Sequence, residues 1–198
     1  PVLYIPREQP EEVQKEPESP AQETAQPAAF ENIVGYDGSL YSYVQIAKAA
    51  VCYPPHGLHT IIFGESGVGK SMFARQMWQF AKEHHLLQEL VEPPFVSLNC
   101  AEYADNPQLL LSQLFGHVRG AFTGADSEKR GLVDDADGGI LFLDEVHRLS
   151  DTGQEMLFML IDNGCYRRLG STKTMQANIM LVCAMTEEIG RASCRERV

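Results

Sequence analysis

Short apolar runs alternate with segments of helical periodicity along most of the chain. Four runs of four to seven residues fit buried strands: 58–63, 95–98, 139–144 and 178–184. Apolar positions recur at helical spacing in three longer segments: 70–85, 107–116 and 153–164. Gly164 fits the left-handed C-cap of the last of these helices. Strands separated by helices predict a parallel α/β sheet.

The two ends of the chain differ from this pattern. Residues 1–29 hold six of the eleven prolines, with two basic and six acidic residues, and this composition predicts a disordered, extended linker. The folded domain is expected over 30–189. Residues 190–198 contain three arginines and almost no apolar side chains, which favours a non-native tail over the alternative, a native solvated helix start.

Composition narrows the class of protein. A hydrophobic content of 44% and a charged content of 22% are typical of a soluble, cytoplasmic globular protein, and no apolar run is long enough to span a membrane. The net charge of −11 argues against a broad nucleic-acid surface, so any binding to DNA is expected outside this chain. Five cysteines without a C-x-x-C pair favour reduced thiols over a zinc site or disulfides.

One Gly-rich segment has the residues and the position of a phosphate-binding loop. The sequence GESGVGKS fits G-x-x-x-x-G-K-S/T, follows a predicted strand and opens a predicted helix. Backbone N–H groups would face the phosphates, Lys70 would contact the β- and γ-phosphates, and Ser71 would bind Mg²⁺. We therefore predict an ATP site made of Gly64, Glu65, Ser66, Gly67, Val68, Gly69, Lys70 and Ser71. A Gly-rich turn without a ligand is the alternative.

A second motif, GGILFLDEVHRL at 138–149, supplies carboxylates. Four apolar residues precede Asp144 and Glu145, which places both acids at the carboxyl end of a buried strand, where ligands bind in open α/β sheets. Asp144 would hold Mg²⁺, and Glu145 would act as general base on the attacking water. With the phosphate loop, this motif predicts a P-loop NTPase that hydrolyses its nucleotide.

Between these motifs lies a segment with no role in phosphate chemistry. Within LFGHVRGAFTGADSEKRG (114–131), two glycines flank Phe122 and Thr123, a composition that suits a tight, mobile loop with the aromatic ring at its tip. Such an exposed ring is a plausible contact for another protein. A surface turn with a tucked-in aromatic side chain is the alternative.

Together these segments resemble the central ATPase domain of bacterial sigma-54-dependent activators, a family within the AAA+ superfamily. The resemblance covers about 30–189 and rests on GAFTGA (120–125), FVSLNCAEY, QLFGH, ADGGILFLDE and RRLGS. Within that family, YPPHGLHTIIFGESGVGKS and NPQLLLSQLFGHVRGAFTGAD are most similar to the levanase-operon type of activators. In that type a winged helix precedes the ATPase, and phosphotransferase-system regulatory domains follow it.

The resemblance implies a fold, a partner and an assembly. The fold is a three-layer α/β/α sandwich of the AAA+ type, ending before its last strand and helical lid, which would leave 58–63 as an unprotected edge strand. The partner is sigma-54 of RNA polymerase, contacted through Gly120, Ala121, Phe122, Thr123, Gly124 and Ala125. A ring, expected to be a hexamer, follows because members complete each site with a neighbour's arginine. No arginine of this chain matches that residue.

The resemblance also implies roles for single residues. Asn99 matches the polar residue that restrains the catalytic glutamate, Glu145, and Thr186 lies where the family usually has an Asn that senses the γ-phosphate. The Thr186 hydroxyl can still donate a hydrogen bond there. Residues 163–177 match the hairpin that moves with the GAFTGA loop, and 30–35 match the segment that lines the adenine pocket.

The expected function is Mg²⁺-dependent ATP hydrolysis that remodels sigma-54 RNA polymerase, with promoter DNA bound only through a domain outside the chain. Two alternatives remain. One is another AAA+ remodeller or a helicase loader, which shares the phosphate motifs but has no reason to carry GAFTGA. The other is a truncated module that binds nucleotide without turnover.

Overall fold

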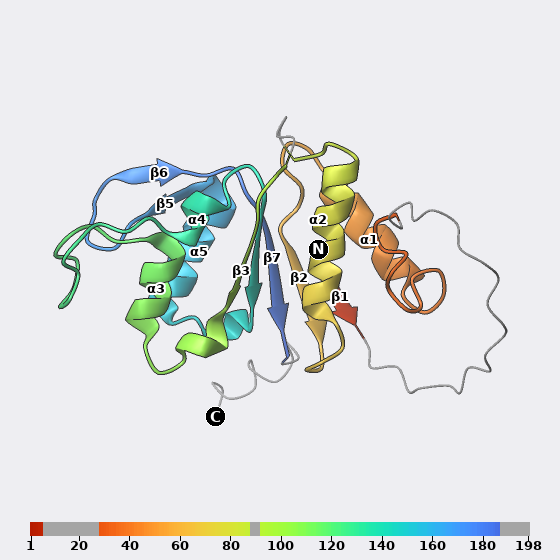
Figure 1. Ribbon diagram of the computed structural model, residues 1–198, viewed down its shortest axis with the longest axis horizontal. Coiled ribbons are helices and arrows are strands. Elements are labelled where there is room, and N and C mark those ends of the chain that lie inside the picture. Colours follow the sequence, from red (N-terminus) through yellow and green to blue (C-terminus); the bar gives the residue numbers. More distant parts are fainter. Residues whose placement is uncertain (6–27, 88–91, 187–198) are drawn as a thin grey trace, which may run out of the picture.

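A five-stranded parallel sheet forms the centre of the computed structural model, which describes residues 1–5, 28–87 and 92–186 (Figure 1). The spatial order is β1-β2-β7-β4-β3. The strands are β1 (Val2–Ile5), β2 (Thr60–Gly64), β3 (Phe95–Asn99), β4 (Ile140–Asp144) and β7 (Met180–Met185). Four of them lie within or beside the four apolar runs, so the predicted parallel sheet is confirmed.

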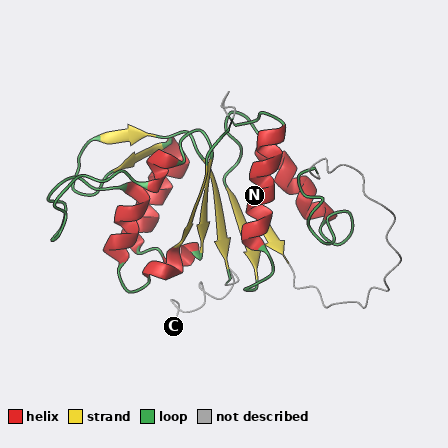
Figure 2. Ribbon diagram, viewed as in Figure 1, coloured by secondary structure: helices red, strands yellow, loops and turns green. Residues whose placement is uncertain are grey.

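Helices cover both faces of this sheet (Figure 2). On one face lie α1 (Tyr41–Cys52) and α2 (Lys70–Glu83), and on the other α3 (Pro107–Phe115), α4 (Leu132–Asp135) and α5 (Asp151–Asn163). Alternate residues of β7 serve the two cores: Met180 and Val182 pack on the α1–α2 side, Leu181 and Cys183 on the α3–α5 side. The predicted three-layer α/β/α sandwich is therefore confirmed.

Local chemistry fixes where several of these helices begin and end. Asn106 accepts a hydrogen bond from the Leu109 N–H at 3.0 Å, and Pro107 takes the first helical position of α3. Gly164 ends α5 in the left-handed conformation, as predicted. Short 3₁₀ turns η1 (Cys100–Tyr103) and η2 (Val146–Arg148) follow β3 and β4.

Two further elements complete the described fold. An antiparallel hairpin of β5 (Cys165–Arg167) and β6 (Thr174–Gln176) follows α5, within the segment that the sequence matched to a hairpin. Helix α1 had not been predicted, although its buried residues Val44, Ala47 and Val51 lie at helical spacing. None of the helices in the described part of the chain is long and apolar enough to cross a membrane.

The N-terminal residues correct two expectations. Residues Val2–Ile5 pair in parallel with β2, so the prediction of a linker over all of 1–29 is wrong for this strand. The prediction that the strand at 58–63 forms an unprotected edge is wrong for the same reason, because β2 lies between β1 and β7. Residues 6–27 and the predicted tail at 190–198 lie outside the described residues.

The physical reason lies in a short apolar run that the composition of the whole segment conceals. Val2, Leu3, Tyr4 and Ile5 have high β-propensity, and Leu3 is fully buried in the core shared with α1 and α2. A strand added to β2 also satisfies backbone groups that would otherwise be exposed: the Ile61 N–H donates to the Pro1 carbonyl at 2.8 Å.

Candidate functional site

The residues predicted to bind nucleotide and to act in catalysis lie at the carboxyl edge of the sheet. Parallel pairing aligns Asn99 of β3 with Asp144 of β4, and Leu143 with Cys183 of β7. Because all strands run in the same direction, the loop after β2 and the residues after β4 and β7 leave the sheet at this same edge. The strands therefore bring together residues that are far apart in the sequence.

The loop from Gly64 to Gly69 joins this edge to helix α2. Gly69 is the N-cap of α2 and has a φ of 92°, a left-handed conformation that favours glycine. Lys70 is only 6% exposed, and its ammonium group donates to the carbonyl oxygens of Gly64 and Glu65 at 2.9 and 3.0 Å. A buried positive charge held by neutral carbonyls at a helix N-terminus suits an anionic ligand.

A cavity of about 630 Å³ lies beside this loop. Its lining includes Ser71, Asn99 and Asp144, together with the polar side chains of Arg75 and Glu102. Mg²⁺ typically takes one or two protein oxygens and completes its shell with water and phosphate oxygens. One hydroxyl and one carboxylate facing one cavity beside a cationic loop fit a Mg²⁺–nucleotide in this way.

Glu145 lies at the turn between β4 and η2, and its backbone is left-handed with a φ of 51°. This conformation is uncommon for a residue other than glycine, and such strain concentrates at functional sites. The Thr186 hydroxyl donates a hydrogen bond to Glu145 Oε2 at 2.9 Å, and His147 Nδ1 lies 3.5 Å from the same oxygen. The turn therefore points the carboxylate of Glu145 toward the end of β7 and the η2 turn.

Asn99 makes a different contact from the one that the resemblance implied. Its Oδ1 accepts a hydrogen bond from the Ala101 N–H at 3.0 Å, so the side chain caps η1. Asn99 does line the cavity beside Asp144. In this structure the hydrogen bond to Glu145 comes from Thr186 instead.

The residue after Asn99 is a buried cysteine. Burial first, and then the negative charges of Asp144 and Glu145, raise the pKa of the Cys100 thiol to about 12. The thiolate is the reactive form of cysteine, and at neutral pH this thiol is protonated. Cys100 therefore packs in the core behind the carboxylates rather than acting as a nucleophile.

The segment that contains GAFTGA forms a loop between α3 and α4, and the backbone closes its base. His117 donates to and accepts from Lys129, at 3.0 and 2.9 Å. Nearer the tip, the Gly120 N–H donates to the Ala125 carbonyl at 2.8 Å. These bonds hold the two arms of the loop together and leave Thr123 and Gly124 exposed at its end.

The sequence suggested a Phe122 ring that projects from the loop tip. In the structure, this ring is instead half-buried against the base of the loop. Its centroid lies 5.0 Å from that of the His117 ring, in an edge-on arrangement. His117 is buried, and its Nδ1 lies 2.8 Å from the Ser112 hydroxyl in α3. The aromatic side chain thus rests on a histidine that α3 holds in place, closer to the tucked-in alternative.

The β5–β6 hairpin packs directly on this loop, on the side of the molecule opposite α1 (Figure 1). The Val118 N–H donates to the Leu169 carbonyl at 3.1 Å, and the Leu169 N–H donates to the Gly116 carbonyl at 3.0 Å. Gly170, with a φ of 74°, approaches Ala121 so closely that a Cβ atom there would lie 2.7 Å from the Ala121 methyl group. Any side chain at position 170 would push the two segments apart.

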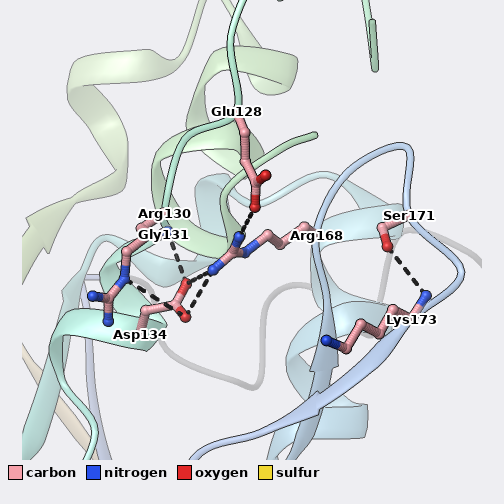
Figure 3. Close-up of polar contacts among 7 residues, drawn as sticks. All are labelled: Glu128, Arg130, Gly131, Asp134, Arg168, Ser171 and Lys173. Atoms are coloured by element: carbon pink, nitrogen blue, oxygen red, sulfur yellow. Dashed lines mark hydrogen bonds and ion pairs between the residues drawn. The ribbon is translucent and has the colours of Figure 1, made fainter. Parts of the chain in front are cut away.

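Figure 3 shows the charged contacts that join hairpin and loop. Arg168 of the hairpin forms an ion pair with Glu128 and a second one with Asp134, at 3.2 Å. Asp134 also accepts from the Gly131 N–H at 3.0 Å at the start of α4. Within the described residues, the buried Arg168 Nε has no hydrogen-bond partner. The guanidinium therefore connects three segments: the hairpin, the distal arm of the loop, and α4.

The pKa values in this cluster show how its charges are stabilised. Burial would raise the pKa of Asp134, but hydrogen bonds from Tyr166, the Gly131 N–H and Arg168 outweigh it, so this pKa lies below its ordinary value. The pKa of Tyr166 is raised, first by burial and then by its hydrogen bond to Asp134. At neutral pH, Asp134 is therefore a carboxylate that accepts hydrogen bonds from the side chains of Tyr166 and Arg168.

Several contacts in this region could not be predicted from short sequence motifs. The Glu145–Thr186 bond joins residues 41 positions apart, and the Arg168–Asp134 pair joins residues 34 positions apart. In the sequence, RRLGS and the His117 of QLFGH contribute only to the family resemblance. The pairing of such residues depends on the strand order and on the packing of the hairpin.

Comparison with known families gives a match over most of the chain. Residues 33–198 match the family described as the Sigma-54 interaction domain. The transcriptional regulatory protein LevR of Bacillus subtilis is 52% identical over 159 residues, 80% of this chain and 17% of that protein. DagR of Salmonella typhimurium is 53% identical over 167 residues, 84% and 18% of the two chains. The chain thus spans less than a fifth of these two relatives.

Other similarities are more distant. The Psp operon transcriptional activator of Escherichia coli is 38% identical over 152 residues, 77% of this chain and 44% of that protein. A crystal structure of NtrX from Brucella abortus in complex with ADP has a TM-score of 0.63 and 22% identity, and it covers 79% of this chain and 31% of NtrX. This structural likeness concerns the fold, and it agrees with an AAA+ α/β sandwich.

Proposed function

Because this chain belongs to the Sigma-54 interaction domain family, we propose that it binds and hydrolyses Mg²⁺-ATP and uses the cycle to remodel sigma-54 RNA polymerase. One observation supports the nucleotide site above all. The buried ammonium of Lys70 lies in a Gly-rich loop, next to a cavity that Ser71 and Asp144 share. The loop residues 64–71 would bind the phosphates, and Ser71 and Asp144 would hold the metal.

Each group of the proposed site would have its own role in nucleotide binding and hydrolysis. On binding, the phosphate oxygens would replace the carbonyl oxygens of Gly64 and Glu65 as partners of Lys70. A Mg²⁺ bound with the nucleotide would neutralise charge on the phosphate oxygens. Glu145 would accept a proton from the attacking water, which its carboxylate can do only after turning toward the cavity.

The GAFTGA loop would carry the contact to sigma-54. Its exposed end, Thr123 and Gly124, is open to a partner, and Phe122 is half-buried beside it. Hairpin β5–β6 is bonded to the base of this loop and to α4, so a displacement of the hairpin would move the loop with it. This arrangement supports a joint movement of the hairpin and the loop when the chain acts on sigma-54.

The wider assembly follows from the family. We propose a ring, with a hexamer as the expected size, in which a neighbouring subunit supplies an arginine to each ATP site. Promoter DNA would be bound by another part of the full-length protein. The relatives LevR and DagR are described as transcriptional regulatory proteins, which agrees with this role.

The nucleotide assignment is tested with two substitutions. Lys70→Ala removes the cationic side chain of the loop and should abolish binding of a fluorescent ATP analogue. Glu145→Gln cannot take the proton of water and should bind the analogue with near-parental affinity while losing steady-state phosphate release. Tight binding by Lys70→Ala would contradict the phosphate site. Binding without turnover in the parent chain would favour the module that holds nucleotide without hydrolysing it.

A further inference from the structure

We propose that Thr186 is the positioning residue that restrains the general base Glu145 in the nucleotide-free protein, the role that the family resemblance gives to Asn99. This inference rests on the proposed ATP hydrolysis. In the nucleotide-free protein, the general base would thus be held by a residue that follows β7 rather than by Asn99 at the end of β3. Thr186 follows Met185, the last residue of β7, and Glu145 follows Asp144, the last residue of β4.

The geometry of Glu145 supports a restraint. Oε2 accepts the Thr186 hydroxyl proton at 2.9 Å, within the ordinary range for a hydroxyl donor. Asn99 and Asp144 belong to the lining of the cavity next to Ser71, whereas the described lining does not include Glu145. The carboxylate is therefore turned toward β7, away from the space where a nucleotide and its attacking water would lie.

A second group stands on the same side of the carboxylate. His147 Nδ1 lies 3.5 Å from Glu145 Oε2, and this nitrogen is buried without a hydrogen-bond partner among the described residues. The left-handed backbone of Glu145 directs its side chain toward these two groups. The Thr186 hydroxyl is the one that forms a hydrogen bond of ordinary length with the carboxylate.

Among the described residues, the NH₂ group of Asn99, the other candidate donor, makes no hydrogen bond to Glu145. The Asn99 carboxamide oxygen caps η1 by accepting from Ala101, at the edge strand of the sheet. A threonine hydroxyl has a single O–H, so while Thr186 donates to Glu145 it cannot donate to a phosphate oxygen. In the resting protein, this hydroxyl therefore holds the base and does not sense the γ-phosphate.

Removing the Thr186 donor should increase the rate of ATP hydrolysis. Thr186→Val keeps the side-chain shape, frees the carboxylate and should raise kcat for ATP hydrolysis on the order of tenfold, the worth of one hydrogen bond to a charged group. KM and the affinity for a fluorescent ATP analogue should not change. Thr186→Ser, which restores the donor, should show a smaller increase. Thr60→Val is the matched control, because it removes a 2.9 Å hydroxyl bond to the Leu58 carbonyl and should leave kcat as in the parent.

The contact itself is tested without nucleotide. In a double-mutant cycle measured by urea unfolding, Thr186→Val should lower the denaturation midpoint less in a Glu145→Ala background than in the parent, because the acceptor is already missing. Additive shifts would overturn the proposed contact even if ATP hydrolysis is confirmed. An unchanged or lower kcat in Thr186→Val would overturn the restraint. If Glu145→Gln hydrolyses ATP as fast as the parent, the proposed reaction fails, and the role of Thr186 fails with it.

Discussion

At the scale of single residues, the Arg168 guanidinium joins the hairpin to the loop and to α4 through ion pairs with Glu128 and Asp134. Removing a charged pair from water is costly, and the cost is recovered only when hydrogen bonds satisfy both partners. Asp134 meets this condition with Tyr166, the Gly131 N–H and Arg168 around its carboxylate. Arg168 meets it less fully because its Nε lacks a partner among the described residues. Removing either partner would therefore leave a largely buried charge without its counter-charge, which destabilises the fold.

Stability should depend on pH through Asp134. Its folded pKa lies below its unfolded value of about 3.9, so the carboxylate stabilises the fold above that pH and loses this contribution as pH falls through the folded pKa. Asp134→Asn should lower the free energy of unfolding by about 2 kcal/mol at pH 7. The difference from the parent should shrink below pH 4 in urea titrations.

The control for this pH dependence is an acidic residue outside the cluster. Asp151 lies exposed in the first turn of α5, and Asp151→Asn should have a smaller effect at pH 7. A pH-independent difference between Asp134→Asn and the parent would show that the Asp134 charge is not part of the stabilising contact.

At the scale of elements, the 116–131 loop and the β5–β6 hairpin form one unit that is separate from the phosphate loop. Backbone hydrogen bonds of Val118 and Leu169 join them, and the close approach of Gly170 to Ala121 leaves no room between them. The phosphate loop, in contrast, belongs to β2 and α2. Changes at the end of the GAFTGA loop should therefore affect the partner and not the nucleotide.

Phe122→Ala and Thr123→Ala in the full-length protein should separate these activities. Both variants should keep near-parental ATP hydrolysis, because neither side chain belongs to the nucleotide site. They should fail to hold sigma-54 in the presence of an ADP–metal-fluoride mimic of the transition state, since losing a buried aromatic anchor typically costs about 2 kcal/mol or more of binding. Co-elution with sigma-54 and open-complex formation are the measurements.

A matched substitution lies on the same loop, nearer α4. Ser127→Ala changes an exposed hydroxyl outside GAFTGA and should leave sigma-54 binding close to that of the parent. If Phe122→Ala and Thr123→Ala also bind sigma-54 and activate transcription normally, the loop is not the contact. The chain would then be an AAA+ ATPase that contacts its partner through another surface.

At the scale of the whole molecule, β1 closes one edge of the sheet from the far end of the sequence. Two neighbouring side chains point to opposite sides, as expected of a docked strand: Leu3 is fully buried, whereas Val2 is 59% exposed. The other edge, β3, lies beside the cavity of the nucleotide site. Leu3 therefore contributes to the core, and neither Val2 nor Leu3 belongs to the described lining of that cavity.

Leu3→Ala should lower the free energy of unfolding by about 2–4 kcal/mol, because it removes a fully buried side chain. Val2→Ala, one residue away and largely exposed, should cost much less. Urea unfolding of both variants measures the difference. Equal and small effects would show that β1 does not dock on β2 in solution.

We expect the rate of the proposed hydrolysis to depend on the proposed ring assembly. An arginine supplied by a neighbour can be worth ~10³–10⁵ in rate in P-loop enzymes, and no arginine of the 198-residue chain matches that residue by resemblance. The chain by itself should hydrolyse ATP slowly. The full-length protein should be much faster, with a specific activity that rises with protein concentration as rings form. Equal specific activities would show that the neighbour is dispensable.

Motif spacing and hydrophobic periodicity determined the outline of this protein. The apolar runs predicted four strands of the parallel sheet, and GESGVGKS and the Asp144–Glu145 pair could be placed at its carboxyl edge, because both motifs directly follow a strand. GAFTGA predicted the family, which the family match confirms. These signals are local: each depends on residues that are neighbours in the sequence.

Tertiary structure decided the contacts between distant segments. Composition averaged over 29 residues hid the four-residue strand β1, whose place depends on the free edge of β2. Only the strand order brings Thr186 to Glu145, and only the packing of the hairpin brings Arg168 to Asp134. A hydrogen bond or ion pair between residues far apart leaves no periodicity and no spacing to read. For this reason, the sequence predicted the site residues, while the fold determined which side chains they contact.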